Sequence, residues 1–338
     1  WRASAPEFGQ TWSKPTVARV DINDPGLNDD KAVVVVGGGY DNAHDTLPNP
    51  ATADAQGAGV FFLDLESGAV LWRAGADSDA NLELPGTSEP GLTRSIPSQV
   101  RVIDLNGDSL ADRMYAADMG GQILRFDITN GNQPDDLVTG GVIAQLGAEG
   151  NAPASFVDTR RFYNTPDVSL FNDNVQNRRF IAISIGSGYR AHPLDDTNAD
   201  RFYSIRDRAV FNSLTQDQYN DFTPITEADL VEVSGQVGTT IGPDDAGWML
   251  TLPDNQKVLS TSATFNNEIF FVAFSAATEE AQSCEAGLGK NFLYRIAVAN
   301  GDPIADLDGE LPDNVDDLRV EQLAQGGIAP SPTFLFPS

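Results

Sequence analysis

The segment VIDLNGDSLADRMYAADMGGQILRFDI, from Val102 to Ile128, combines two patterns that decide the fold prediction. Its second half places apolar runs on both sides of Gly120–Gly121, which is typical of two β-strands joined by a tight turn. Its first half gathers four acidic or amide side chains between Asp104 and Asp112. The chain therefore concentrates negative charge in a short loop directly before a strand that we expect to be buried.

The strand pattern of this segment recurs along the chain. Each repeat opens with a Ser or Thr, usually a Pro, and a short alternating β-run; these openings lie at residues 12–21, 94–104, 163–173, 259–269 and 329–338. Proline fits the first residue of a strand, where its missing N–H costs least. In the first four repeats two further apolar runs follow, with turn signals such as SG and NG near their ends.

Four such repeats predict an all-β protein, with a fifth repeat beginning at Ala329. Repeated units of this kind are typical of a modified β-propeller with four-stranded antiparallel blades and long loop insertions. A two-sheet sandwich is the alternative, since it also accounts for the strands, but it does not account for their ordered repetition. The polar loop insertions lie at residues 40–58, 74–93, 132–160, 189–200 and 208–246.

Two segments of the insertion at residues 208–246 carry helical signals. They are Asn212–Phe222 and Thr226–Val233, and the second opens with Thr226 and Asp229 at the spacing of a capping pair. We expect residues 1–338 to form one β-propeller domain. Because the chain opens on Trp1 in mid-pattern, we expect a C-terminal fragment of a larger protein, with early blades missing or with the two ends closing the ring.

The composition excludes several classes of function. The net charge is −28, from 21 basic and 49 acidic residues, and this argues against binding to nucleic acid or to an anionic membrane surface. No apolar run approaches the roughly 20 residues of a membrane-spanning helix. The single cysteine, Cys284, cannot form a disulfide within this chain, and the two histidines lack zinc spacing. No G-x-S-x-G or H-E-x-x-H motif is present, so we expect no enzyme and no catalytic residues.

The acidic loop has the spacing of a calcium site. With Asp104 as position one, Asn106 is at position three, Asp108 at five, Leu110 at seven and Asp112 at nine. This is the oxygen-donor order of an EF-hand-type loop, in which position seven supplies its backbone carbonyl. The spacing therefore predicts Ca²⁺ as the cofactor, and an Asx-turn loop with solvated carboxylates is the alternative.

The loop departs from the EF-hand pattern at two places. Position six is Ser109 rather than Gly, and Gly107 at position four is available for the turn. Position twelve is Tyr115 rather than the usual bidentate Glu. Because the flanks read as strands, we expect the loop on a β-scaffold, closed by Asp112.

Two weaker echoes of the loop occur elsewhere. Asp21 and Asn23 take positions one and three of the first, but the following DPGLNDD is too long to continue the register. The second is Asp306–Glu310. We therefore predict one calcium ion rather than two.

Several stretches carry a resemblance to a known family. They are FGQTWSKPTVARV, VVVVGGGYDN, GVFFLDLESGAVLW, IAISIGSGYRAHP, DRFYSIRD, GWMLTLP and, most specifically, SIPSQVRVIDLNGDSLADRMYAADMGGQILRFDI. In this order they resemble the C-terminal β-propeller domain of PilY-family proteins, which are type IV pilus assembly factors and tip adhesins. The resemblance covers almost the whole chain.

The resemblance implies a propeller that is exported through the periplasm, is associated with the outer membrane and acts outside the cell at the pilus tip (the fimbrium). It implies one calcium ion held by Asp104, Asn106, Asp108, Leu110 and Asp112. It also implies a role in pilus assembly, in the balance of extension and retraction, in twitching motility and in adhesion. The implied partners are minor pilins of the tip complex, and host or abiotic surfaces.

Two other classes of function fit parts of the sequence. An integrin-type calcium-loop propeller for extracellular protein binding would carry the loop in several blades, whereas one intact loop is present here. A quinone-dependent dehydrogenase also uses a calcium-bearing propeller, but its stacking aromatics are not evident, since the four Trp residues recur at no fixed place in the repeats.

Overall fold

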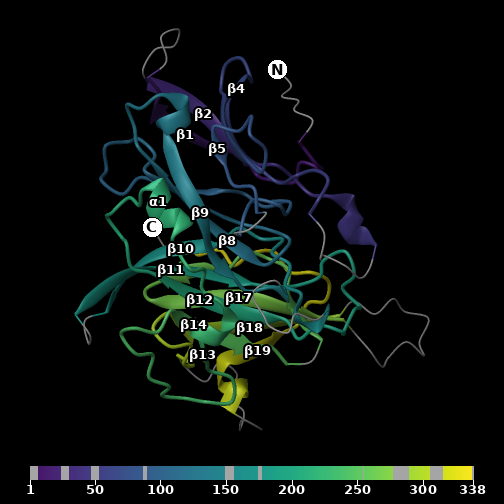
Figure 1. Cartoon of the computed structure of the whole chain (residues 1–338). Coiled ribbons are helices and arrows are strands. Elements are labelled where there is room, and N and C mark those ends of the chain that lie inside the picture. The colour runs from purple at the N-terminus through teal and green to yellow at the C-terminus, as the bar shows by residue number, and fades with distance from the viewer. Residues whose placement is uncertain are drawn as a thin grey trace. The chain divides into compact units, whose positions relative to one another are not determined.

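The structure is a computed structural model, and it describes residues 7–23, 30–46, 53–86, 90–148, 156–173, 177–253, 255–276, 289–304 and 315–336. The chain divides into two compact units. Unit 1 is made of Trp1–Thr165 and Phe211–Thr226, and unit 2 of Pro166–Val210 and Glu227–Ser338. Most of the described regular structure is β-strand (Figure 1).

Unit 1 contains two sheets. The first has the order β1-β2-β3-β4-β5, with β1 at Thr16–Asp21, β2 at Asp30–Gly37, β3 at Val60–Asp64, β4 at Val70–Gly75 and β5 at Leu82–Glu83. The second has the order β6-β7-β8-β9, with β6 at Arg101–Ile103, β7 at Arg113–Ala117, β8 at Gln122–Ile128 and β9 at Val138–Gln145. All neighbours are antiparallel except β4 and β5. Among the described residues of this unit, the short helices are α1 at Gln216–Asn220 and the 3₁₀ turns η1 at Asn42–Asp45, η2 at Pro134–Asp136 and η4 at Phe156–Asp158.

Unit 2 also contains two sheets. The first has the order β10-β11-β12-β14-β13, with β10 at Asp167–Asp173, β11 at Arg178–Gly186, β12 at Arg201–Asp207, β13 at Val231–Glu232 and β14 at Gly247–Thr251. The second has β15 at Gln256–Val258, β16 at Ala263–Phe265, β17 at Glu268–Ser275, β18 at Lys290–Ala297 and β19 at Val320–Leu323. Strands β15 and β16 both pair with β17, and β13 and β14 are parallel. The 3₁₀ turns are η5 at Glu227–Asp229 and η6 at Val315–Arg319.

Aromatic side chains fill the core of each unit. In unit 1 the buried Trp72 ring lies 4.7 Å from the Phe62 ring and 6.4 Å, edge-on, from the Phe126 ring of the other sheet. In unit 2 the Phe271 ring stacks between Phe202, at 3.9 Å, and Tyr294, at 4.5 Å. Such pairs add to the large apolar area that each ring buries, so they join the sheets of each unit.

The predicted strand runs are confirmed in the four repeats, although the opening strands β6 and β16 have only three residues each. The predicted fifth repeat is wrong, because residues 329–336 form no strand. The predicted loop 132–160 contains strand β9, whose two glycines obscure its alternation. The sequence also gave no signal for the two-residue parallel strands β5 and β13.

The helical signals have different outcomes. Residues 212–222 contain α1, and a capping box formed by Thr215 and Gln218 begins it. Residues 226–233 instead form the turn η5 and the strand β13, so the expected helix is absent there. No helix of the described residues is long and apolar enough to cross a membrane.

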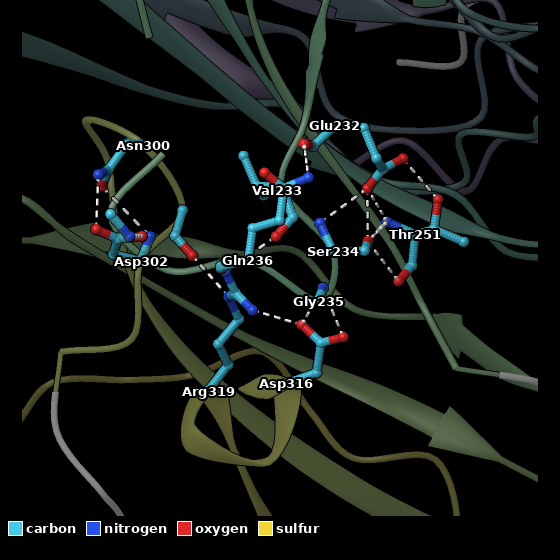
Figure 2. Close-up of polar contacts among 12 residues, drawn as sticks. Glu232, Val233, Ser234, Gly235, Gln236, Thr251, Asn300, Asp302, Asp316 and Arg319 are labelled. Carbon is cyan, nitrogen blue, oxygen red and sulfur yellow. Dashed lines mark hydrogen bonds and ion pairs between the residues drawn. The ribbon is translucent and has the colours of Figure 1, made fainter. Parts of the chain in front are cut away.

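A buried arginine of unit 2, Arg319, contacts several separate segments, and Figure 2 shows its surroundings. The guanidinium of Arg319 is fully buried and donates to the carbonyls of Gly301, at 2.8 Å, and Val233, at 3.1 Å. It also pairs with the carboxylate of Asp316, which accepts the backbone N–H of Gly235 at 2.9 Å. One cation therefore satisfies backbone groups of segments far apart in the sequence.

We predict that Arg319→Lys lowers the free energy of unfolding by about 2–3 kcal/mol, because an ammonium cannot reproduce the planar fork of donors and leaves buried carbonyls unpaired. Chemical denaturation measures this. The matched control is Arg295→Lys, since Arg295 pairs with Glu268 near the surface and its loss should cost less than about 1 kcal/mol. Equal losses for the two variants would contradict the structural role of Arg319.

Candidate metal site

The predicted calcium loop connects β6 to β7, and backbone hydrogen bonds hold its base. The N–H of Asp112 donates to the Ile103 carbonyl at 2.9 Å, and the Asp112 carbonyl accepts the N–H of Ile128 at 2.8 Å. The N–H of Ala111 donates to the carbonyl of Arg19 in β1 at 2.8 Å. Three neighbouring strands therefore fix the end of the loop, as expected for a loop on a β-scaffold.

Asp104 shapes the first turn of the loop. One of its carboxylate oxygens accepts the N–H of Gly107 at 2.6 Å, and the other accepts the N–H of Ser109 at 2.9 Å. These backbone donors, Gly107 first, lower the pKa of Asp104 because they stabilise the charged carboxylate. The ionised carboxylate of Asp104 thus holds the backbone of residues 107–109 in a turn around it.

Three of the other predicted ligands lie within reach of one another. The amide nitrogen of Asn106 donates to a carboxylate oxygen of Asp108 at 3.1 Å and to one of Asp112 at 3.3 Å. The second oxygen of Asp112 accepts the N–H of Leu105 at 2.6 Å, and the second oxygen of Asp108 accepts the N–H of Leu110 at 2.8 Å. The partly positive amide N–H₂ group therefore occupies the point where the two carboxylates converge.

This arrangement fits calcium in its donor types and in the winding of the loop. Each carboxylate oxygen has two lone pairs, so the oxygens that accept one N–H keep capacity for a metal ion. The three carboxylates are not drawn to one point, since the described residues hold no group of three or more His, Cys, Asp or Glu arranged to hold a metal ion. The five-ligand site thus stays a prediction.

The turn of the loop is made at two residues. Gly107 has φ +83° and no atom within 4 Å of the position a Cβ would take, so its glycine serves conformation alone. Ser109 has φ +74°, in the left-handed region that a non-glycine residue adopts at a cost. Position six, which is Gly in EF-hand loops, therefore also has a positive φ here, although its residue is Ser109.

The weaker echoes bring no second cluster together among the described residues. Asp21 accepts, through its carbonyl, the N–H of Gly131 at 3.0 Å, and its N–H donates to the side chain of Asn130 at 2.9 Å. Asp30 pairs with Arg19. The remaining residues of the first echo, 24–29, lie outside the described residues, as do Asp306–Glu310 and Cys284.

Sequence reasoning missed the buried charges directly behind the loop. Arg113, Arg125 and Asp127 are each about 99% or more buried, and Asp127 bridges both arginines at 2.6 and 2.8 Å. The hydroxyl of Tyr219, from α1, donates to Asp127 at 2.7 Å. Their position could have indicated a buried ion-pair cluster, because these charged residues occur in strands whose other residues are mostly apolar.

Asp118, in the turn between β7 and β8, has a structural role. It is buried and accepts the N–H groups of Gly120 and Gln122, both at 2.9 Å, and the Gln122 side-chain amide at 2.7 Å. Burial raises the pKa of Asp118 to about 7, although the hydrogen bonds from Gln122 and Gly120 act to lower it. The acid in the quoted AADMGGQ stretch thus caps the turn rather than facing the loop.

The sheets and the loop together define an all-β, propeller-like protein with one acidic loop of calcium-binding spacing inside a blade. Comparison with solved structures supports this class. The crystal structure of the Pseudomonas aeruginosa PilY1 C-terminal domain matches 95% of this chain and 67% of that chain, with a TM-score of 0.60 and 18% identity. The predicted all-β propeller fold is therefore confirmed.

Sequence comparison finds the same protein. The type IV pilus biogenesis factor PilY1 of P. aeruginosa strain PAO1 is 33% identical over 132 residues, and that of strain UCBPP-PA14 is 32% identical over 130 residues. Each match covers 38% of this chain and 9% of the relative's length. No protein-family model matches the chain. The chain is thus homologous to PilY1 and has the fold of its C-terminal domain, which confirms the predicted resemblance to PilY-family C-terminal domains.

We predict that Ser109→Gly raises the free energy of unfolding by about 0.5 kcal/mol. Relief of the left-handed backbone is worth about 1–2 kcal/mol, and the added flexibility of glycine in the unfolded chain offsets roughly 0.5–1 kcal/mol of it. Chemical denaturation measures the difference. Ser213→Gly is the matched control, because Ser213 is exposed and lacks a positive φ, and it should be neutral or destabilising. A destabilised Ser109→Gly would show that the loop does not need this turn.

Proposed function

We propose that this chain is a calcium-binding propeller module of a type IV pilus biogenesis protein. The observation that supports the role most strongly is the homology to PilY1, whose name describes a type IV pilus biogenesis factor. The match of its C-terminal domain to 95% of the chain agrees with it. The acidic loop adds the calcium part of the proposal, through its spacing and its winding around Asp104.

The ligands in this proposal are the side chains of Asp104, Asn106, Asp108 and Asp112 and the carbonyl of Leu110. They are hard oxygen donors of the kind that calcium takes. Calcium would supply positive charge among three carboxylates that otherwise repel one another. Because Asp112 hydrogen-bonds through its backbone to Ile103 and Ile128, loss of that repulsion would stabilise the junction of β6, β7 and β8. The loop is thus a regulatory staple and not a catalytic centre.

In the pilus, this module would support assembly, the balance of extension and retraction, and adhesion to surfaces. It would act outside the cell at the pilus tip, in contact with minor pilins, and contribute to twitching motility. The absence of catalytic motifs from the sequence favours a binding role over an enzymatic one.

We predict that calorimetric titration of calcium into the chelator-treated protein gives one site. Asp108→Ala and Asp112→Ala should each abolish the heat of binding, because each removes one of three carboxylates that offset the charge of the ion. Calcium should raise the melting temperature of the unaltered protein and leave that of the two variants unchanged.

The matched control for this titration is Asp64→Ala. Asp64 also accepts turn N–H groups, from Glu66 and Ser67, but it lies in the hairpin between β3 and β4 and not in the acidic loop. The Asp64→Ala variant should show the same heat of calcium binding as the unaltered protein. A site that survives both Asp108→Ala and Asp112→Ala would contradict the assignment and direct attention to Asp21 and Asn23.

The pilus role is tested separately by co-purification with the minor pilins of the same organism. We predict that the full-length protein retains at least one minor pilin in calcium, and that Asp112→Ala retains less. If no pilin is retained in calcium or in chelator, the assembly role fails, and a free-standing calcium-dependent adhesin accounts better for the loop.

A further inference from the structure

A polar cavity of about 510 Å³ lies in unit 1, between the turn that follows β8 and the segment that begins α1. Most of the described residues that line it carry amide or hydroxyl side chains, including Asn23, Thr129, Gln133, Ser213 and Thr215, and Asp136 adds a carboxylate. The volume falls in the range of roughly 300–1,000 Å³ that is usual for small-molecule sites. The composition differs from most such sites, whose walls are mainly apolar.

Hydrogen bonds fix two walls of this cavity. The hydroxyl of Thr139 donates to the carbonyl of Leu214 at 2.7 Å, and the amide of Gln216 both donates to and accepts from the backbone of Gly140 at 3.0 Å. In the turn that follows β8, the side chain of Asn132 donates to the carbonyl of Asp136 at 3.0 Å. The cavity is therefore shaped before any ligand arrives, which lowers the entropy cost of binding.

Other side chains in the lining keep their polar atoms available. Gln133, Asp136 and Ser213 make no side-chain hydrogen bond within the described residues, although their backbones are held in η2 and in the segment before α1. Together they offer a carboxylate, an amide and a hydroxyl on a fixed frame. Such a set can both donate to and accept from a ligand.

The charges of the lining restrict the class of ligand. None of the described residues that line the cavity is Lys, Arg or His, and the chain carries a net charge of −28, so an anionic ligand is disfavoured. Leu214 has the single aliphatic side chain among the described lining residues, so few side chains there favour an apolar ligand. Asp136 has the single carboxylate among the same described residues, too few for a metal ion that wants six or more oxygens.

A neutral molecule with many hydroxyl groups satisfies all of these restrictions. Vicinal hydroxyls both donate to a carboxylate and accept from an amide, and the bond to Asp136 is charge-assisted. We propose that this cavity binds a neutral saccharide, with Asp136, Gln133 and Ser213 as its recognition groups. The site is separate from the calcium loop, and the inference goes beyond the proposed pilus role without depending on it.

Saturation-transfer NMR with methyl glycosides of glucose, galactose, mannose and N-acetylglucosamine tests this proposal, with glucuronate as the anionic counterpart. We expect at least one neutral glycoside to bind with a millimolar Kd, since no aromatic ring is present to stack on the sugar. Asp136→Asn should weaken it at least about tenfold through loss of the charge-assisted bond. Glucuronate should not bind, because Asp136 repels its carboxylate.

The matched control is Asp135→Asn. Asp135 is the preceding residue of the same turn, but it accepts a hydrogen bond from Asn81 at 2.7 Å and does not line the cavity. This variant should bind the glycoside within about twofold of the unaltered chain. The proposal is overturned if no glycoside saturates, which leaves an open hydrated cleft, or if the two variants lose binding equally. If a glycoside binds, a glycan array then shows whether the cavity prefers a monosaccharide or a sugar unit within an oligosaccharide.

Discussion

Asp127 is the buried charge on which the arrangement of unit 1 depends. Its two oxygens bridge the guanidinium groups of Arg113 and Arg125, at 2.6 and 2.8 Å, and accept the hydroxyl of Tyr219 and the N–H of Leu214. Taking such charges out of water is expensive unless every partner is in place. The cluster therefore constrains β7, β8 and the segment 211–226 to one mutual arrangement.

The two candidate sites of unit 1 are both connected to this buried cluster. Arg113 directly follows Asp112, so the closing residue of the acidic loop and the first buried cation of β7 are neighbours in the chain. Both arginines also donate to the carbonyl of Asn212, at 2.9 and 2.7 Å, next to the segment that walls the polar cavity. A conformational change in the acidic loop and one in the 211–226 segment would therefore both alter the contacts of Arg113 and Arg125.

The sequence predicted the features that depend on local periodicity and spacing. Apolar runs located β2, β7, β11 and β17, and the order of oxygen donors located the loop at Asp104. Features that arise from tertiary contacts gave no such signal. Arg319 is surrounded by carbonyls from segments far away in the chain, and nothing near it in sequence distinguishes it from a surface arginine. The polar cavity is likewise assembled from short segments around residues 23, 131 and 214.

The predicted fifth strand failed for a related reason. A run that alternates in sequence becomes a strand only where a neighbour offers free backbone groups, and residues 329–336 instead pack through Phe334 against the rings of Phe265 and Phe270. The sequence indicated the turn of the acidic loop at Gly107, which has a positive φ, but it did not indicate the positive φ of Ser109 at position six. The convergence of all three carboxylates on one ion, which the spacing predicts, stays a prediction, since it depends on the ion itself.

Hydrogen–deuterium exchange of the chain, with calcium and with chelator, tests the central claim most directly. If calcium is the staple of the β6–β7 junction, amides of residues 105–112 exchange at least about tenfold more slowly in calcium, and protection extends into β7. Strand β17 of unit 2, at Glu268–Ser275, serves as the internal reference and should not change. Identical exchange of residues 105–117 in both conditions would contradict the claim, because the loop would then be a plain turn whose carboxylates need no ion.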